Sequence, residues 1–437
     1  MLKIYKISIV AALAGFLFGF DTVVISGADQ QLQALWNTSD LFHGSIVMSM
    51  ALWGTVIGAL FASYPCDIWG RKKTLIGIGF LYLISAIGSG ISTDPYMFSF
   101  FRFVGGLGVG ASTIAGPTYI SEIAPASKRG RLVALYQFNL VFGILVAYIS
   151  NYSLQNFGNE PWRWMIGIES IPALIYLIGI INIPYSPRWL LISNKNPLLV
   201  NKIYKEINQR SLSDSEIQNI LNHDEQSDKL FSRKFIKPLI LSFLISFFNQ
   251  LSGINAFLYY APRIFEAAGL KSDSAFLSSI GVGLVNLIFT MLGMYLIDKT
   301  GRRTLIKIGS VGYIISLSMV GLFFLLNWKG FLIPLFLFVF IAAHAIGQGT
   351  VIWVFIAEIF PNHLRAKGQS FGSSVHWILA SIITLIMPSL LSKLSNPGYI
   401  FFCFAFFMVF QYLFVIFLMP ETKNISLEKL SSKILKT

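Results

Sequence analysis

The sequence contains few charged residues and almost no cysteine. Only 12% of its 437 residues are Asp, Glu, Lys or Arg, whereas about a quarter of an ordinary soluble domain is charged. The two cysteines, Cys66 and Cys403, lie in opposite halves of the chain, so we expect no disulfide. We also find no nucleophile–base pair, metal-ligand cluster or phosphate loop, so we expect no enzyme, no bound metal and no cofactor.

Long apolar runs take the place of the missing charge. The chain is 55% hydrophobic, its mean hydropathy is +0.67, and nearly uncharged stretches of about 20 residues, enough to cross a bilayer as a helix, recur throughout. No short alternating segments typical of a membrane β-barrel occur. We therefore predict an all-α membrane protein with spans at about 7–27, 44–64, 74–92, 96–118, 132–152, 163–183, 237–261, 275–297, 304–326, 331–357, 368–391 and 398–419.

The positive charges are distributed unequally between the two sides of the predicted bundle. The net charge of +13 alone could suggest a nucleic-acid partner. However, with both termini on one side and the central loop excluded, that side carries 18 Lys and Arg against 5 on the other. This bias follows the positive-inside rule, so we expect both termini in the cytoplasm and no nucleic-acid partner.

One charged sequence motif occurs twice. Asp67 to Lys72 recurs as Asp298 to Arg303, and Ser121 to Pro125 recurs as Ala357 to Pro361, at spacings of 231 to 236 residues. Pro184-Tyr185-Ser186-Pro187 recurs more loosely as Pro420-Glu421-Thr422-Lys423. A duplicated membrane bundle that holds its substrate between the halves is typical of a secondary transporter.

The repeat divides the chain into three predicted parts. Residues 1–183 form an N-terminal six-helix bundle, and residues 237–437 form a C-terminal six-helix bundle with a short cytoplasmic tail. Residues 184–236 are a polar cytoplasmic linker in which 201–208 and 213–221 have the pattern of short amphipathic helices. A flexible connection without further function is the alternative.

The repeated charges predict a network at the cytoplasmic helix ends. A topology signal alone would explain the cations but not the repeated acids, so we expect ion pairs that close this side in one state and separate in another. The members of this cytoplasmic charge network are Asp67, Arg71, Glu122, Arg129, Asp298, Arg302, Glu358 and Arg365.

Asp21 is an acidic residue in the middle of the first span. A charge at the bilayer centre costs about 2.5–3.5 kcal/mol on insertion scales, so it indicates a function such as carrying a proton. Arg102 in the fourth span is the expected partner, and it can release Asp21 when Asp21 is protonated. A structural ion pair is the alternative. Glu169 in the sixth span is a further candidate, for which structural and functional interpretations remain open.

The seventh span contains the polar sequence Asn249 to Asn255. On an intact helix Gln250 and Asn255 would be about 140° apart, so they share a face only if the helix unwinds, and Ser252-Gly253 is the expected break. Amides both donate and accept hydrogen bonds, which suits a neutral polyhydroxyl ligand. Gln137 and Asn286, in the fifth and eighth spans, add similar groups. A single buried amide is more often a polar contact between packed helices, but as a set across several spans these amides favour a neutral hydrophilic substrate.

Two tryptophans lie away from the membrane interfaces where this residue is usual. Trp353 and Trp377, in the tenth and eleventh spans, could stack against a sugar ring or could simply pack. Gly347 and Gly349 should soften the tenth span. For His344 and His376 we expect neutral, hydrogen-bonded imidazoles, although either could titrate.

Taken together and in order, these motifs resemble the sugar porter family of the major facilitator superfamily. The matching stretches are Gly19 to Gly27, the Asp67 and Asp298 loops, Arg102 with its glycine run, Tyr119 to Glu122, Pro184 to Trp189, Gly253-Ile254-Asn255 with Tyr259-Tyr260, and Pro420 to Lys423. The resemblance implies the major facilitator fold, with twelve transmembrane helices in two pseudo-symmetric halves that work by alternating access. It also implies a multi-pass protein of the bacterial inner membrane that is functional as a monomer.

The resemblance implies roles for particular residues. It marks Asp21 as the proton-coupling residue with Arg102 as its partner, and we group Glu169 with them. The expected sugar-binding residues are Gln137, Asn249, Gln250, Asn255, Tyr259, Asn286, Trp353, His376 and Trp377. Asn249, Gln348, Thr350, His376 and Ala380 depart from the family's usual side chains, which affects the choice of sugar, and Ser63 and Tyr185 depart in the cytoplasmic motifs.

The implied function is proton-coupled import of a hexose or pentose. Facilitative members have a non-ionisable residue where Asp21 stands, so the aspartate favours symport. A facilitative uniporter and a non-transporting sugar sensor are the alternatives. The partners are then a monosaccharide, a proton and the lipid bilayer.

Overall fold

The structure is a computed structural model that describes residues 2–125, 128–193, 197–208, 211, 217, 229–328, 330–361, 364–423 and 425. Twelve helical segments in this part of the chain are long and apolar enough to cross a membrane. Each overlaps one of the twelve spans expected from the sequence, so the prediction of an all-α, multi-pass membrane protein is confirmed.

The helices form two sets of six spans. The first set comprises α1 (Leu2–Leu35), α2 (Asp40–Phe42) with the π-helix η1 (His43–Met48) and α3 (Met50–Phe61), α4 (Ser63–Ile68), α5 (Arg71–Gly90), α6 (Pro95–Ile123), α7 (Arg129–Leu154), α8 (Pro161–Gly167) and α9 (Ser170–Ile181). The second comprises η3 (Arg233–Phe235), α13 (Ile236–Leu251), α14 (Ile254–Tyr259), α15 (Ala261–Ala267), α16 (Ser272–Thr300), α17 (Arg302–Leu325), α18 (Leu332–His344), the π-helix η4 (Ala345–Gly349), α19 (Thr350–Ile359), α20 (Arg365–Lys393) and α21 (Gly398–Phe417).

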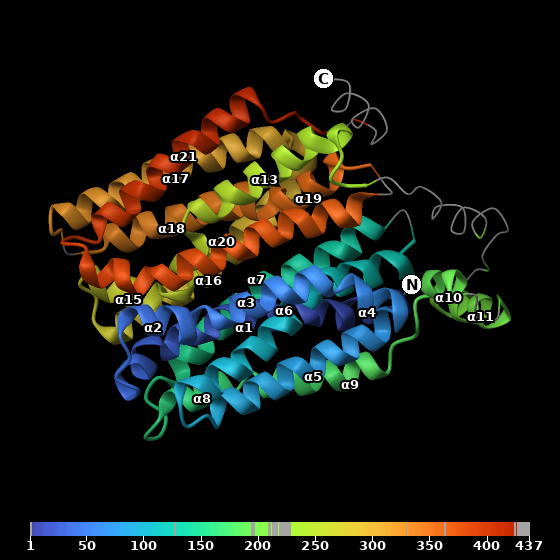
Figure 1. Cartoon of the computed structure of the whole chain (residues 1–437), viewed down its shortest axis with the longest axis horizontal. Helices are drawn as coiled ribbons and strands as arrows, with labels where there is room; N and C mark the ends of the chain where they lie inside the picture. Colours follow the sequence, from blue (N-terminus) through green and yellow to red (C-terminus); the bar gives the residue numbers. More distant parts are fainter. Residues whose placement is uncertain are drawn as a thin grey trace.

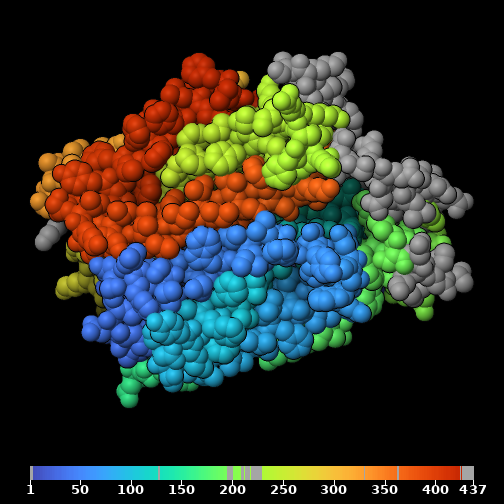
Figure 2. All heavy atoms as spheres, in the orientation of Figure 1, coloured from blue at the N-terminus to red at the C-terminus, as the bar shows by residue number. Residues whose placement is uncertain are grey.

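The two sets lie side by side as two bundles (Figure 1). The helices α1 to α9 form one bundle and α13 to α21 form the other, with α3 packed on α20 and α7 packed on α16 across the boundary. Figure 2 shows the first bundle in blue against the orange α20 along most of the length of the molecule.

Two linker helices, α10 (Pro187–Ile192) and α11 (Pro197–Asn208), lie beyond one end of the bundles (Figure 1), which we call the linker end. The other end, where α2, α8 and α15 lie, we call the far end. The expected linker helix over 201–208 is part of α11. The one expected over 213–221 lies outside the described residues except for Ile217.

Local sequence signals explain where several helices begin. Asp94 caps α6, because its carboxylate accepts the backbone N–H groups of Tyr96 and Met97 at 3.0 Å each, and Pro95 occupies the first helical position. Gly70 and Gly301 precede α5 and α17 with φ of 86° and 96°. Both glycines stand at the same place in the duplicated motif, and this region of φ is strained for other residues.

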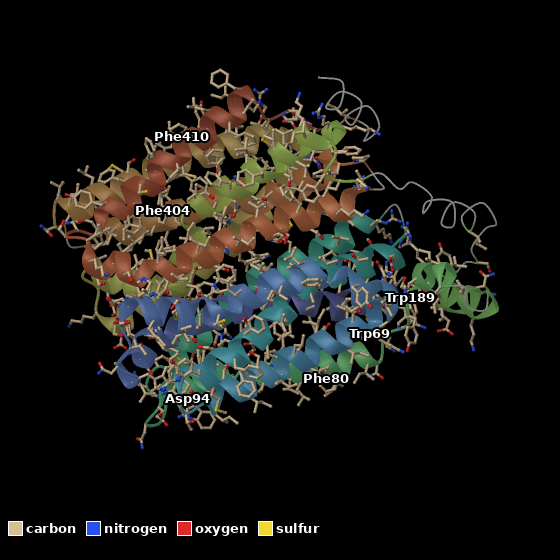
Figure 3. The ribbon with its side chains drawn as sticks, in the orientation of Figure 1. Trp69, Phe80, Asp94, Trp189, Phe404 and Phe410 are labelled. Carbon is tan, nitrogen blue, oxygen red and sulfur yellow. The ribbon has the colours of Figure 1, made fainter. Side chains whose placement is uncertain are left out.

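Two of the spans in the C-terminal bundle are interrupted near their middle. Between α13 and α14, Gly253 adopts φ of 80°, and a Cβ there would lie 2.4 Å from the ring of Phe404. Phe404 lies on α21, labelled in Figure 3. The tenth span contains η4, which includes Gly347 and Gly349. The expected break at Ser252-Gly253 is therefore confirmed, and the π-helix of the tenth span lies at the two glycines that are expected to soften it.

At the far end, polar contacts join the two bundles. Gln30 donates to Glu266 at 2.6 Å, and Arg263 lies 3.4 Å from the Asp29 carboxylate. Ser392 donates to Asp40 at 2.6 Å. The two bundles are thus tied together at the end opposite the linker.

Candidate functional site

The first element of the site is an ion pair between α1 and α6. Arg102 Nη1 lies 2.5 Å from Asp21 Oδ1, and Arg102 Nη2 donates to Asp21 Oδ2 at 3.3 Å and to the Asp21 backbone carbonyl at 3.0 Å. Asp21 and Arg102 are 1% and 0% exposed. The expected pairing is therefore present, and its strength depends on Asp21 being ionised because a neutral carboxyl loses the Coulomb attraction.

Glu169 and Tyr259 surround this pair. The Glu169 carboxyl is buried, interacts electrostatically with Asp21 and Arg102, and neither of its oxygens accepts a hydrogen bond from a described group. Tyr259, at the end of α14, lies within electrostatic range of the same two side chains, and α14 packs on α1. The pair therefore lies close to the boundary between the bundles.

The second element is a cluster of amides at the break between α13 and α14. Asn255 Nδ2 donates to Gln250 Oε1 at 2.9 Å, so the unwinding at Gly253 brings these two side chains together as the sequence predicts. Gln250 Nε2 donates to Asn249 Oδ1 at 2.9 Å and lies 3.0 and 3.2 Å from the two ring nitrogens of His376. All four side chains are at least 92% buried.

Aromatic rings cover one side of this cluster. The His376 ring lies between two indoles, with its centroid 5.1 Å from that of Trp353 and 4.7 Å from that of Trp377. Trp353 is half-buried, whereas Trp377 is buried and packs edge-on against Phe18 of α1, and its indole N–H has no hydrogen-bond partner among the described residues. Trp353 is therefore the indole with a surface available to a ligand.

The two remaining expected amides are placed differently. Gln137 is half-buried on α7, while Asn286 is buried on α16, where its carbonyl oxygen accepts from Thr290 at 3.3 Å one turn away. His344 is not part of the cluster, because its Nδ1 lies 2.6 Å from the Tyr313 hydroxyl. This contact agrees with the expected hydrogen-bonded imidazole.

The charge network at the linker end has the same form in both bundles. Arg71 pairs with Asp67 at 3.0 Å and with Glu122 at 2.9 Å, and Arg302 pairs with Asp298 at 3.0 Å and with Glu358 at 2.8 Å. Each of these pairs joins helices of a single bundle. These four ion pairs thus organise each bundle by itself.

The third, looser motif completes this network. Ser186 donates to Glu122 at 2.6 Å, and Thr422 donates to Glu358 at 2.5 Å. Ser186 and Thr422 stand at the same position of the repeated motif, and each hydroxyl binds the glutamate of its own bundle. Arg129 and Arg365 donate instead to the backbone carbonyls of Ser121 and Ala357, at 3.0 and 2.9 Å.

The two copies of this third motif differ at the position of Glu421. Glu421 accepts the backbone N–H groups of Arg302 and Arg303 at 3.0 and 3.1 Å, which caps α17 with a carboxylate. Its counterpart in the repeat is Tyr185, whose ring lies 5.0 Å from the Lys72 ammonium. The adjacent Trp189, labelled in Figure 3, donates to the Asp67 carbonyl at 2.8 Å. Tyr185 therefore contacts the start of α5 through a cation–π interaction with Lys72, whereas Glu421 caps the start of α17 directly.

Sequence reasoning missed two polar groups. At the far end, His43 Nε2 lies 2.8 Å from Asp29, and both side chains are buried. In the C-terminal bundle, Gln348 and Gln411 are fully buried and hydrogen-bonded to each other at 2.8 Å. The available signal was a polar side chain inside an apolar span. Such a side chain indicates that a hydrogen-bonding partner exists but does not identify the partner.

The paired bundles, the intramembrane ion pair and the amide cluster at a broken helix define a secondary transporter of the major facilitator fold. The chain matches the family described as "Sugar (and other) transporter" over residues 7–433. It belongs to this family of sugar transporters and not to a family of enzymes, as expected from the sequence.

The chain is similar to proteins of named activity. It is 35% identical to the arabinose-proton symporter of Bacillus subtilis over 98% of this chain and 95% of that protein. Among solved structures, it resembles the xylose transporter XylE of Escherichia coli in a partially occluded inward-open conformation, with a TM-score of 0.86, 32% identity, and coverage of 98% of this chain and 100% of that one. XylE bound to 6-bromo-6-deoxy-D-glucose matches with a TM-score of 0.83, 31% identity and coverage of 99% of each chain.

Proposed function

We propose that this protein is a proton-coupled monosaccharide importer that works by alternating access. The observation that carries the proposal is the fully buried Asp21–Arg102 pair within a fold whose similar proteins include an arabinose-proton and a xylose-proton symporter. A buried carboxylate that changes partner on protonation is the feature that a symporter needs and a passive carrier does not.

The amide cluster is the proposed sugar site. Gln250, Asn255 and Asn249 present donors and acceptors without net charge, which suits the hydroxyls of a neutral hexose or pentose. The half-buried Trp353 supplies an indole face for the C–H side of a sugar ring. Gln137, Tyr259, Asn286, His376 and Trp377 complete the proposed set, with Asn286 and Trp377 having to leave their present packing to reach a sugar.

The proposed coupling step is a transfer of one proton to Asp21. Protonation removes the carboxylate charge, so Arg102 loses its ionic partner and the contact between α1 and α6 weakens. Glu169 lies near the pair and receives no hydrogen bond from the residues that the structure describes, and one proton shared between the Glu169 and Asp21 carboxyls would replace their repulsion with a hydrogen bond. Deprotonation on the other side of the membrane restores the pair and resets the cycle.

We further propose that the linker end faces the cytoplasm of a bacterium and that the structure represents an inward-facing state. The excess of Lys and Arg at the linker end supports this orientation. The contacts between the bundles at the far end would close the outer side. The higher TM-score to inward-open XylE than to the sugar-bound form agrees with this state. In this proposal residues 1–183 and 237–437 rock about one central site, and one chain contains the whole pathway.

The experiment is uptake of labelled sugar by purified protein in liposomes. Arabinose, xylose, glucose and galactose are offered with and without an inward proton gradient. We expect accumulation above equilibrium only with the gradient, since 100 mV is worth about 2.3 kcal/mol per charge, or roughly a fifty-fold concentration ratio. Equal, merely equilibrating uptake under both conditions would identify a uniporter, and binding without uptake would identify a sensor.

Asp21→Asn provides the decisive variant. It keeps the shape of the side chain but cannot take up a proton, so we expect it to lose gradient-driven accumulation while retaining sugar exchange. The matched control is Asp94→Asn, which affects a capping carboxylate at the start of α6 outside the ion pair. Proton-driven accumulation by Asp21→Asn would contradict the coupling role.

A further inference from the structure

A line of buried hydrogen bonds runs from the proposed sugar site into the C-terminal bundle. Asn249 Nδ2 donates to Gln348 Oε1 at 3.5 Å, and Gln348 Nε2 donates to Gln411 Oε1 at 2.8 Å. Gln411 Nε2 donates to Ser310 Oγ at 2.8 Å, and Ser310 Oγ donates to the backbone carbonyl of Ile306 at 2.7 Å. The line crosses α13, η4, α21 and α17, and its last three side chains are completely buried.

The end of this line fixes the direction of every bond in it. The Ile306 carbonyl can only accept, and the Ser310 hydroxyl has a single hydrogen, so Ser310 must accept from Gln411 through its oxygen. Gln411 then presents its carbonyl oxygen to Gln348, and Gln348 presents its own to Asn249. Turning any one amide over would place two donors or two acceptors face to face in a buried site.

The same order continues into the sugar site. Asn249 Nδ2 donates to Gln348, away from the site, so Asn249 Oδ1 is left to accept from Gln250 Nε2 at 2.9 Å. Gln250 Oε1 in turn accepts from Asn255 Nδ2, so the Asn255 carbonyl oxygen is left for a ligand. A serine two helices away thereby determines which edge of each amide faces the site.

We propose that Gln348, Gln411 and Ser310 are positioning residues that set the donor and acceptor pattern of the sugar site, and hence its choice among sugars, without touching the sugar. This inference rests on the proposed sugar site. The 3.5 Å contact between Asn249 and Gln348 is the longest in the line, so sugar binding can shorten it with little rearrangement of the buried part.

Kinetics of sugar exchange in liposomes test this inference. In Gln411→Met, which keeps the length of the side chain, Gln348 loses its acceptor and can turn over, and Asn249 can follow. We expect KM for the best sugar to rise by roughly tenfold, which corresponds to the loss of one good hydrogen bond. We also expect the order of preference among arabinose, xylose, glucose and galactose to change. The maximal exchange rate should stay within about twofold, since these residues do not touch the moving sugar.

Substitution of two similar serines on α17 distinguishes an effect on the positioning of the amides from an effect on the stability of the protein. Ser310→Ala removes the end of the line. Ser316→Ala also removes a buried hydroxyl whose shortest contact, at 2.6 Å, is with the carbonyl four residues earlier, but Ser316 is not part of the line. Both should lower the melting temperature to a similar extent, and only Ser310→Ala should raise KM. Combining Ser310→Ala with Gln411→Met should add little to the KM of either, because both interrupt one line.

Three results would overturn the inference. The first is an unchanged KM and sugar order in Gln411→Met. The second is an equal rise in KM in Ser316→Ala, which would reduce the line to ordinary packing. The third is a wild-type protein that moves no sugar, which would overturn the proposed function as well, whereas the first two leave it intact.

Discussion

At the scale of single residues, burial has different consequences for different polar groups. Asp21 and Arg102 are buried with each other, so each supplies the charge that the other needs. Glu169 is buried near them, and no group in the described part of the chain donates a hydrogen bond to its carboxyl. Cys66, outside the spans at the linker end, is also 2% exposed, and burial raises the pKa of its thiol to about 11. The thiol is therefore neutral at physiological pH and a poor nucleophile.

This pKa gives a prediction for chemical labelling. In a Cys403→Ser protein, whose remaining cysteine is Cys66, we expect slow alkylation by N-ethylmaleimide near neutral pH. Because the thiolate is the reactive form, the rate should rise about tenfold per pH unit until the pH reaches the pKa of about 11. Mass spectrometry of samples taken between about pH 7 and 10 gives the profile. A rate that levels off near pH 8 would contradict the raised pKa.

At the scale of helices, the break between α13 and α14 shapes the site. Gly253 is necessary there for two reasons: its φ of 80° is strained for other residues, and a Cβ would lie 2.4 Å from a ring carbon of Phe404. Without the break, Gln250 and Asn255 would point to different sides of one helix. The hydrogen bond of 2.9 Å between them depends on this one residue.

We therefore predict that Gly253→Ala is damaging. A left-handed alanine alone costs about 1 kcal/mol, and the contact with Phe404 adds to that, so we expect a lower melting temperature and a several-fold loss of sugar binding. The control is Gly77→Ala on α5, where a Cβ would meet nothing within 4 Å. Alanine there should be neutral or stabilising by up to about 1 kcal/mol. Equal behaviour of the two variants in thermal and uptake assays would show that the break tolerates a side chain.

Much of this architecture could be predicted from the sequence, because membrane spans and broken helices have local signals. The spans, the break at Gly253 and an irregularity near Gly347 follow from hydropathy and glycine alone. The helix ends were less predictable: α1 covers Leu2–Leu35, beyond the expected 7–27, because its polar ends stay helical outside the apolar stretch.

The residues that escaped prediction depend on partners far away in sequence. Gln411 meets Ser310, 101 positions earlier, and Arg263 meets Asp29, 234 positions earlier. Neither contact has a repeat or motif to mark it. Asn286, in contrast, was predicted as a sugar contact because it is an amide, but its side-chain carbonyl accepts a hydrogen bond from Thr290 one turn away.

At the scale of the whole molecule, the contacts at the far end bias the equilibrium between states. Asp29 of α1 binds His43 in its own bundle and Arg263 in the other, so one buried carboxylate links both bundles. Gln30–Glu266 and Ser392–Asp40 add uncharged–charged hydrogen bonds across the same boundary. At the linker end the ion pairs of Arg71 and Arg302 lie within each bundle.

Arg263→Gln should therefore shift the protein toward a state that is open at the far end. The Arg263 side chain is 21% exposed and Asp29 is 1% exposed, so we expect a loss of about 1 kcal/mol and a several-fold change in population. Spin labels at Leu41→Cys and Lys271→Cys, in a protein with Cys66→Ser and Cys403→Ser, report the separation. The distance distribution should gain a longer component.

Arg163→Gln is the control for this experiment. Arg163 also pairs with an acid near the far end, but its partner Glu160 is three residues away in the same bundle. Its removal should leave the spin-label distances unchanged. The bridging role of Arg263 fails if both variants give the parent distribution, or if both broaden it equally.

The ordered line from Asn255 to Ile306 has an electrical consequence. Every amide in it turns its oxygen toward the Asn255 end, at the proposed sugar site, and its nitrogen toward Ser310, so the small dipoles add instead of cancelling. The site therefore faces the negative end of an aligned stack inside a poorly polarisable bundle. Hydroxyl hydrogens are stabilised there, whereas the anionic group of a uronic acid or a sugar phosphate is repelled. A cell could then keep phosphorylated sugar on its inner side without loss through the same passage that admitted the neutral form.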